Sequence, residues 1–585
     1  MASLISKASL LMVPSVYEDG TLYNVLPSGN KAPDETGNHN GYDQTRADFT
    51  FSRGSNLSAT RIGPNGLIEK GRENLLLQSN NFDTTWATNN ASVTSGQSGY
   101  DGSSNAWKLQ SSSTGVNYLY QIISSNAVQT FSIYAKAGNT DWMRINILQS
   151  GTNANNYYDI SNGIKGVSPS APIIDDKIES VGNGWYRISI VVNISITQIR
   201  IQTAVADGNE TSASGDNIYI QDAQLEKGLV STPVIRTGAT TATAGVLENT
   251  PRIDYSSGAG ALLLEPQRTN LIVNSEYANS TNWGNGGTTY SNNEATSPDG
   301  GVNAIKLSED NSTAFHYLGS DISGVSTADT YSISGFIKKG SRRYGGLRAV
   351  TNGFVNRYFV LLDLEDGSVV DTHTQGSGVT WSYNVEDYGS GWYRIEISGA
   401  HTSGTIGGTF SPSDTDSPTY FGALPDYNGV TGENIYCYGL QAERGSHVSS
   451  YVPTYGSAAT RGADQGTISG ASHAIGQDTG SVFLEYDNLD NDGGNIWFNV
   501  AGTSSFNDWI FVGQSGSNSR MYLKANNTIL KNYQVAQSNG ITKLCITYDE
   551  STGAKFFMNG AKVDTYTGAF TFSQSLAKVQ MNGGG

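Results

Sequence analysis

Cysteine is nearly absent from this chain of 585 residues, which contains only Cys437 and Cys545. Two cysteines cannot form a disulfide framework or a zinc site with the usual four ligands. No apolar run reaches the roughly 18 residues that a membrane-spanning helix needs. Charged residues make up only 15% of the chain and sum to a formal charge of −17. That balance excludes the basic surface typical of nucleic-acid binding.

The motifs of common catalytic sites are also missing. None of the six histidines follows a metal-ligand spacing. Neither a Gly-x-Ser-x-Gly elbow nor a phosphate-binding loop ending in Gly-Lys-Ser/Thr occurs. A carboxylate pair for glycoside hydrolysis cannot be chosen from 52 acidic residues by sequence alone. We therefore expect that the protein is not an enzyme and needs no cofactor.

The residues that are abundant indicate β-structure. The chain contains 69 glycines and 32 tyrosines, and 37% of its residues are hydrophobic. Glycine is typical of tight turns, and tyrosine is frequent in strands. At roughly 150 residues per domain, the length predicts several domains.

An internal duplication is the strongest signal in the sequence. Four blocks occur twice in the same order, and the separation grows from 196 residues for the first block to 217 for the last. The second copy therefore has longer loops between the same elements. The paired blocks are 67–75 with 263–271, 101–109 with 299–307, 184–188 with 391–395, and 217–228 with 434–445.

The third block shows the period-2 alternation of a strand. Its apolar positions share one face in both copies, and an Asn-Gly or Ser-Gly pair precedes each strand. We expect these positions to point into equivalent cores: Tyr186, Ile188 and Ile190 in the first copy, and Tyr393, Ile395 and Ile397 in the second. In the fourth block Cys437 stands where the first copy has Ile220, which predicts a buried and inert thiol.

The duplication divides the chain into domains. We predict an all-β protein of tandem antiparallel jelly-roll β-sandwiches in an elongated multidomain chain. The linkers are rich in small, polar residues, and we expect them to be extended, too polar to be buried within one chain, and to lie along a neighbouring chain. The predicted segments are an N-terminal attachment and oligomerisation segment (1–65), sandwich copy 1 (66–235), a linker (236–261), sandwich copy 2 (262–455), a second linker (456–465) and a third module (466–585).

The third module carries a recognisable pattern. A strand ends in Thr547-Tyr548-Asp549, and a hairpin turn follows at Asn559-Gly560. This pattern resembles the concanavalin-like (laminin-G-type) jelly roll. The sequence ends where that family would continue with one or two closing strands, so we expect either that the module is incomplete or that another segment covers its open sheet edge.

The duplicated modules are similar to carbohydrate-binding jelly rolls, and the whole chain resembles structural proteins of tailed bacteriophages. The residues that carry the second resemblance are 8–14, 59–69 and 262–270, together with the repeated Gly-Trp-Tyr-Arg. The resemblance implies a virion structural protein, a tail fibre or surface appendage that contributes to recognition of host-surface glycan. It also implies synthesis in the host cytoplasm, a homotrimer, and contacts of the N-terminal segment with sister chains and other virion proteins.

Two alternatives remain open at this stage. An alternative to the virion protein is a secreted carbohydrate-binding adhesin or an accessory part of a glycan-degrading enzyme, although too few residues are left over for a catalytic domain.

An alternative interpretation of the apolar residues before Pro14 is a short cleaved signal. A single lysine and the lack of a small-residue cleavage site favour a first β-strand instead.

Candidate binding residues follow from the chemistry of sugars, whose rings stack on exposed aromatic side chains. Trp142, Tyr344 and Trp509 are the candidates, although most aromatic residues must fill the sandwich cores.

The residues Asn488, Asp490 and Asp492 have the spacing of the first half of a calcium loop. The bidentate glutamate expected later in such a loop is missing, so a polar hairpin loop is the alternative. A structural calcium is also considered at Asp101 and Asp299, against a simple Asp-Gly turn.

Overall fold

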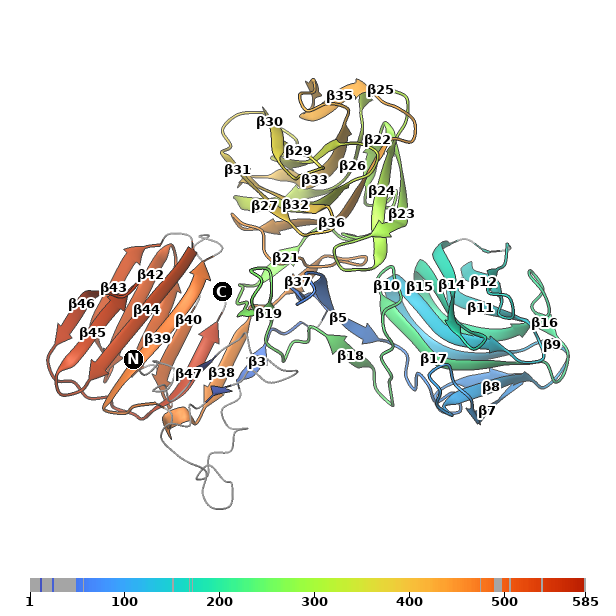
Figure 1. The fold of residues 1–585 in the computed structure, drawn as a ribbon, viewed down its shortest axis with the longest axis horizontal. Coiled ribbons are helices and arrows are strands. Elements are labelled where there is room, and N and C mark those ends of the chain that lie inside the picture. Colours follow the sequence, from blue (N-terminus) through green and yellow to red (C-terminus); the bar gives the residue numbers. More distant parts are fainter. Residues whose placement is uncertain are drawn as a thin grey trace, which may run out of the picture.

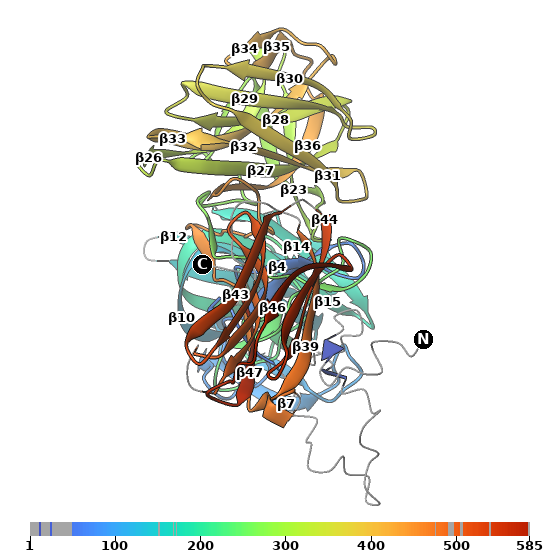
Figure 2. The same cartoon turned by 90° about the vertical axis from the view of Figure 1, so that its left-hand side faces the viewer.

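The computed structural model describes residues 11–12, 24–25, 49–55, 57–149, 152–167, 169–170, 172–473, 475–488, 497–503, 507–537 and 540–582. These residues form strands, turns and a three-residue 3-10 helix, η4 (Ala471–His473). Three lobes surround a hub of short strands (Figure 1), and one lobe stands above the other two when the molecule is turned (Figure 2). The predicted all-β class is confirmed. No helix in the described part of the chain is long and apolar enough to span a bilayer.

The first lobe, sandwich 1, is built from an antiparallel sheet of ten strands. Two 20-residue strands bend and run through both of its layers, so one sheet closes on itself as a sandwich. One layer contains β6 (Ala87–Asn89), β11 (Trp142–Gln149), β12 (Thr152–Asp159) and β13 (Ile164–Lys165); the other contains β7 (Ala91–Gln97), β8 (Ala106–Ser111), β14 (Ile173–Gly182) and β17 (Asn217–Lys227); both contain β10 (Tyr118–Ala137) and β15 (Trp185–Ala204).

The second lobe, sandwich 2, has the same strand order in two separate six-stranded sheets. The strands equivalent to β10 and β15 are each interrupted by a few extra residues, and these residues account for part of the greater length of the second copy. One sheet contains β22 (Gly284–Gly286), β26 (Tyr317–Val325), β33 (Gly404–Ser413), β28 (Tyr344–Thr351), β29 (Asn356–Asp363) and β30 (Val369–Gln375); the other contains β23 (Thr288–Thr296), β24 (Val302–Glu309), β36 (Asn434–Arg444), β27 (Asp329–Lys339), β32 (Trp392–His401) and β31 (Trp381–Asp387).

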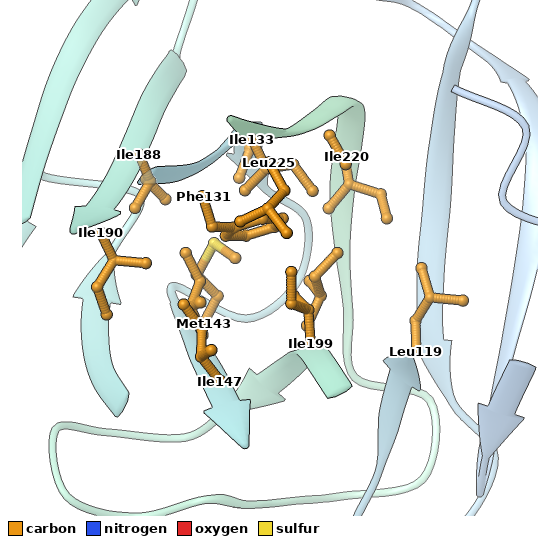
Figure 3. Packing of buried hydrophobic residues seen from close by; sticks show 14 of the residues in the cluster. Leu119, Phe131, Ile133, Met143, Ile147, Ile188, Ile190, Ile199, Ile220 and Leu225 are labelled. Atoms are coloured by element: carbon orange, nitrogen blue, oxygen red, sulfur yellow. The ribbon is translucent and has the colours of Figure 1, made fainter. Parts of the chain in front are cut away.

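The cores of the two sandwiches are equivalent, as the alternation predicts. Ile188 and Ile190 are fully buried in the first core, and Tyr186 packs against it. Isoleucine, leucine and phenylalanine side chains from both layers converge there (Figure 3). Ile395 and Ile397 occupy the same positions in the second core. Cys437 is also buried there, and burial raises the pKa of its thiol, which confirms the predicted inert cysteine. The finer jelly-roll topology stays a prediction.

The repeated sequence blocks have repeated structural roles. The buried amide of Asn74 donates to the carbonyl groups of Ala223 and Ile235, and Asn270 donates in the same way to Leu440 and Val452. Each asparagine thereby ties the strand before a sandwich to the residues that leave it. Buried polar groups require such partners, so the duplicated asparagine is explained by chain closure and not by binding.

Turn chemistry also agrees with the sequence. Asn183 and Gly184 both have positive φ angles, as do Ser390 and Gly391. Two consecutive positive φ angles are the geometry of a tight type I′ hairpin turn, which glycine adopts without steric cost. These turns begin the Gly-Trp-Tyr-Arg strand in each copy.

The third module differs from the expectation of an incomplete domain. Its last strand, β47 (Leu576–Asn582), is paired on both sides. The edge strand beside β38 is β3 (Thr50–Ser52), and Phe49 and Phe51 enter the module's core. Residues 49–52, which the sequence placed in a separate attachment segment, therefore complete this module. Its seven-stranded sheet contains β3, β38 (Gln465–Ser469), β47, β40 (Trp497–Gly502), β41 (Trp509–Ser515), β42 (Asn518–Ala525) and β43 (Thr528–Ala536); the facing sheet contains β39 (Thr479–Asn488), β44 (Gly540–Asp549), β45 (Gly553–Met558) and β46 (Ala561–Thr567).

The hub is formed by the predicted linkers, which pair within the chain. The strand before each sandwich pairs with the connector that leaves the same sandwich. The expectation that the linkers are too polar to be buried within one chain is wrong, because these connectors supply buried arginine and aspartate side chains. The hub strands are β4 (Thr60–Ile62), β5 (Ile68–Asn74), β18 (Ala242–Gly245), β19 (Ile253–Asp254), β20 (Ala261–Leu262), β21 (Arg268–Asn270) and β37 (Ala459–Arg461).

Several short strands pair outside the large sheets. In the N-terminal region β1 (Leu11–Met12) pairs with β2 (Asn24–Val25). Sandwich 1 carries the pair β9 (Gly115–Val116) and β16 (Thr211–Ser212). Sandwich 2 carries a larger three-stranded sheet at the equivalent place, made of β25 (Thr313–Phe315), β35 (Leu424–Asn428) and β34 (Tyr420–Phe421).

Candidate functional site

Two of the three aromatic candidates occupy equivalent positions in the two sandwiches. Trp142 begins β11 and lies opposite Asp159 and Ala204 on the neighbouring strands. Tyr344 begins β28 and lies opposite Asp363 and Ser413. Both residues belong to the face of their layer that points away from the core, which we call the outer face.

The outer face of sandwich 1 combines aromatic and hydrogen-bonding side chains. Core residues Met143, Ile145 and Ile147 alternate along β11 with residues of the outer face. Side chains from four adjacent strands share that face: Tyr118 and Tyr120 from β10, Gln198, Arg200 and Gln202 from β15, Trp142, Arg144 and Asn146 from β11, and Asn155 and Tyr157 from β12.

Arg144 is held firmly in this face. Its guanidinium lies 5.5 Å from the ring centroid of Tyr157, and Nη1 donates to Gln202 Oε1 at 3.1 Å. Glu210 forms an ion pair with the same guanidinium. These contacts fix the floor of the face and neutralise the charge of Arg144.

Arg200 lies over the ring of Tyr118, with 4.3 Å between the guanidinium carbon and the ring centroid. Its Nε donates to Gln198 Oε1 at 2.6 Å. The ring of Tyr120 packs edge-on against Tyr118 at 5.6 Å. In contrast to Arg144, Arg200 forms no ion pair with a carboxylate in the described part of the chain.

Asn146 lies at the centre of the face, directly opposite Arg200 on one neighbouring strand and Asn155 on the other. Its side chain is only 4% exposed, and its Oδ1 receives no hydrogen bond. A buried acceptor without a donor costs about 1–3 kcal/mol. An acceptor of this kind is expected where a bound hydroxyl or a water supplies the missing donor.

The equivalent face of sandwich 2 is covered by its own chain. Gly319 and Gly346 replace Tyr120 and Arg144 at the matching register positions. The space is filled by an apolar cluster that includes Tyr344 beneath the three-stranded sheet; its members are Phe315, Tyr317, Tyr344, Phe359, Leu361, Tyr420 and Leu424. Tyr344 is partly buried against this cluster, and the guanidinium of Arg343 lies 5.5 Å from its ring centroid.

The central residue of this covered face is Arg348, at the position of Asn146. It donates to the carbonyl oxygen of Gly422 and to Thr409 Oγ1, both at 3.0 Å. Gly422 belongs to the hairpin turn between β34 and β35. An oxygen of the chain itself thus meets the polar centre of the outer face in sandwich 2.

Trp509 lies in the third module, in a separate aromatic cluster. It is on the outer face of the seven-stranded sheet, with ring centroids 5.2 Å from Tyr522, 5.7 Å from Phe511 and 6.5 Å from Trp497. Each ring meets Trp509 at a steep angle, so Trp509 is part of a packed cluster. Trp142 and Trp509 do not belong to one site.

The metal candidates receive no support. Asp490 and Asp492 lie outside the described residues, and Asn488 is the last residue of β39, whose side chain is not described. Asp101 and Asp299 instead meet cationic side chains: Arg236 at 3.1 Å from Asp101, and Lys70 at 2.5 Å from Asp299. Among the described residues, no group of three or more His, Cys, Asp or Glu side chains is arranged to hold a metal ion.

A buried carboxyl group elsewhere in sandwich 2 makes stability depend on pH. Burial raises the pKa of Glu396 to about 7, with nearby Glu386 adding to the rise and Arg394 opposing it. The charged form therefore costs stability above pH 7, and this cost disappears as the pH falls through 7 toward the unfolded value. We expect Glu396→Gln to stabilise the protein by about 1–3 kcal/mol at pH 8.5, measured by chemical denaturation.

The control for this prediction is Glu485→Gln, which removes the same charge from an exposed pair with Lys543. Its effect is expected to be below about 1 kcal/mol at every pH. Equal effects of the two substitutions at pH 8.5 would contradict a raised pKa at Glu396.

Sequence reasoning found Trp142 but missed Asn146, Arg200 and Tyr118. The available signal was the alternation in residues 142–149 and 198–204, where polar side chains interleave with buried aliphatic ones. What could not be read from the sequence was the pairing of these distant segments side by side.

Comparison of the chain with models of known protein families and with curated proteins found no match.

Proposed function

We propose that this protein is a carbohydrate-binding structural protein, and that the outer face of sandwich 1 holds the sugar. The observation that carries the proposal is the buried Asn146, whose acceptor oxygen lacks a donor at the centre of an aromatic and polar face. Trp142 and Tyr120 offer ring surfaces on which a pyranose can stack. Asn155, which is partly exposed, offers a further hydrogen-bonding side chain for hydroxyls.

The contrast between the two copies supports this assignment. The same face is filled in sandwich 2 by the chain's own apolar side chains and by the carbonyl oxygen of Gly422. In sandwich 1 the corresponding strands β9 and β16 are only two residues each. A duplicated fold with one face covered and the other uncovered fits one sugar site per chain.

We further propose that the protein is part of a virion, as a tail fibre or surface appendage of a tailed bacteriophage. The support is the sequence resemblance carried by residues 8–14, 59–69 and 262–270. One shallow site per chain binds weakly, and a homotrimer would gain affinity by binding three sugars at once. Sedimentation of the purified protein checks the trimer, and a secreted adhesin remains the competing identity.

The test of sugar binding compares single substitutions on an array of bacterial surface glycans. We expect Trp142→Ala and Asn146→Ala each to weaken binding about tenfold, the equivalent of 1.4 kcal/mol. Asn146→Ala is a sharper probe than Trp142→Ala because it removes hydrogen-bonding groups without changing the aromatic surface. Thermal denaturation of both variants checks that they are folded.

Trp509→Ala is the matched control, since it removes a partly exposed tryptophan from a different sheet. It is expected to leave glycan binding unchanged. Loss of binding with Trp509→Ala, but not with the two variants in sandwich 1, would place the sugar on the third module and refute the proposal.

A further inference from the structure

We infer that the sugar bound by sandwich 1 carries an acidic group, a carboxylate or a sulfate, and that Arg200 binds it. This inference rests on the proposed function, because it names the class of glycan that the same face accepts. It follows from a difference between the two arginines of the face: Arg144 has a carboxylate partner, and Arg200 has none among the described residues.

The two arginines of the face differ in their partners. Arg144 is paired with Glu210, and its guanidinium also donates to Gln202 and Asn155. Among the described residues, Arg200 contacts Gln198 and the ring of Tyr118 and has no carboxylate partner. A guanidinium that lies over an aromatic ring can still donate through the N–H groups at its own edge. Arg200 therefore retains an uncompensated charge and unused donors.

The surrounding acidic residues are occupied elsewhere. The carboxylate of Asp159 accepts from Ser161 and Asn162, and these hydrogen bonds, against the opposing effect of burial, lower its pKa. Glu210 is committed to Arg144. Arg200 is left without a carboxylate partner among the described residues, and an anionic ligand would supply that partner.

The position of Arg200 suits a sugar acid. It lies directly opposite Asn146, and side chains paired in this way are about 5 Å apart at Cβ. A sugar whose acidic group meets the guanidinium of Arg200 would therefore lie over Asn146. Planar guanidinium groups bind carboxylate and sulfate oxygens through two parallel hydrogen bonds.

Sandwich 2 shows the same chemistry satisfied internally. Its buried guanidinium, on Arg348, meets an oxygen of the chain itself, the Gly422 carbonyl. In sandwich 1 the guanidinium belongs to Arg200, which lies on the neighbouring strand at the position equivalent to Thr409. In the described part of sandwich 1 the equivalent strands, β9 and β16, are only two residues each. An oxygen of the ligand would occupy this position in sandwich 1.

The experiment uses the full-length protein and an array of matched glycan pairs. Uronate, sialate and sulfated glycans are each placed beside a carboxyl-reduced or desulfated counterpart. We expect at least tenfold stronger binding to the acidic member of a pair, and the two kinds of acid distinguish a carboxylate from a sulfate ligand. The preference is expected to shrink as salt is raised, because exposed charges are screened.

Arg200→Gln is expected to abolish the preference while leaving weak binding to the neutral member. Arg200→Lys is expected to keep part of the preference, because it retains the charge but loses the planar fork. If wild-type protein binds acidic and neutral members equally, the inference fails while the proposed function stands. If wild-type protein binds no glycan of either kind, both fail. A preference that survives in Arg200→Gln also overturns the role of Arg200.

Discussion

Replacing Asp464 with alanine is expected to destabilise the hub by about 3–5 kcal/mol, the typical cost of leaving a buried charge without its partner. Asp464 accepts from Arg252 Nε at 3.1 Å and from Arg53 Nη1 at 3.3 Å. Both arginines are buried, and they come from segments almost 200 residues apart in the sequence. Asp464 therefore joins the hub to the strand β3 that completes the third module.

The neighbouring acid cannot take over this role. Glu265 already pairs with Arg252 at 2.7 Å and with Arg461 at 2.9 Å. Without Asp464, three buried arginines would share a single carboxylate. The chain has several lobes and is not expected to unfold in two states, so calorimetry is the appropriate measurement. We expect the transition that includes the hub to fall by roughly 10 °C.

Glu485→Ala is the control for Asp464→Ala, because it removes an acid from an exposed pair with Lys543. Such a pair contributes at most about 1 kcal/mol. If Asp464→Ala lowers the transition no more than Glu485→Ala does, the hub does not depend on its buried ion pairs.

Replacing Lys70 with methionine is expected to cost a similar amount at neutral pH. Lys70 lies on β5, and its Nζ is 2.5 Å from Glu276 and from Asp299 and 2.7 Å from the hydroxyl of Tyr438. Burial alone would lower the pKa of Lys70, but Asp299 and Glu276 outweigh it and raise the pKa well above its ordinary value. The substitution leaves two buried carboxylates facing each other.

The pH dependence of this variant distinguishes charge from packing. In the native protein Lys70 holds the pKa of Asp299 low against the effect of burial, so this pair adds stability above pH 4 and loses it as the pH falls. In Lys70→Met the carboxyl pKa values are expected to rise, so the deficit should shrink between pH 7 and pH 4. Calorimetry across this range measures the change.

A combined variant separates the two explanations further. Lys70→Met together with Glu276→Gln and Asp299→Asn removes all three charges and keeps their approximate shape. We expect it to recover much of the lost stability at neutral pH. No recovery would show that Lys70 acts through packing on Tyr438 and its neighbours, not through its charge.

Much of the fold could be predicted because it depends on local pattern. The alternation around Ile188 and Ile395, the turns at Asn183 and Ser390, and the buried Cys437 are all readable from neighbouring residues. The duplication extends these predictions, because the burial predicted for a position in one copy also applies to the equivalent position in the other.

The parts that sequence reasoning missed depend on contacts between distant segments. Nothing near Phe51 indicates that it completes a sheet formed by residues more than 400 positions later. The linker residues Arg252 and Asp464 appeared to be ordinary polar positions, and only their pairing makes them the centre of the hub. Tyr344 and Trp142 are both candidates by residue type, and the packing of Tyr344 against Tyr420 and Leu424 depends on a hairpin within the longer loops of the second copy.

The most direct test of the central claim is hydrogen–deuterium exchange of the full-length protein with and without a glycan identified on the array. The two sandwiches provide an internal control, because the same strands occur in both. We expect the glycan to slow exchange in residues 142–149 and 198–204 of sandwich 1 and to leave residues 344–351 and 404–413 of sandwich 2 unchanged. Slower exchange in sandwich 2 or in the third module, with none in sandwich 1, would contradict the claim that the outer face of sandwich 1 binds the sugar.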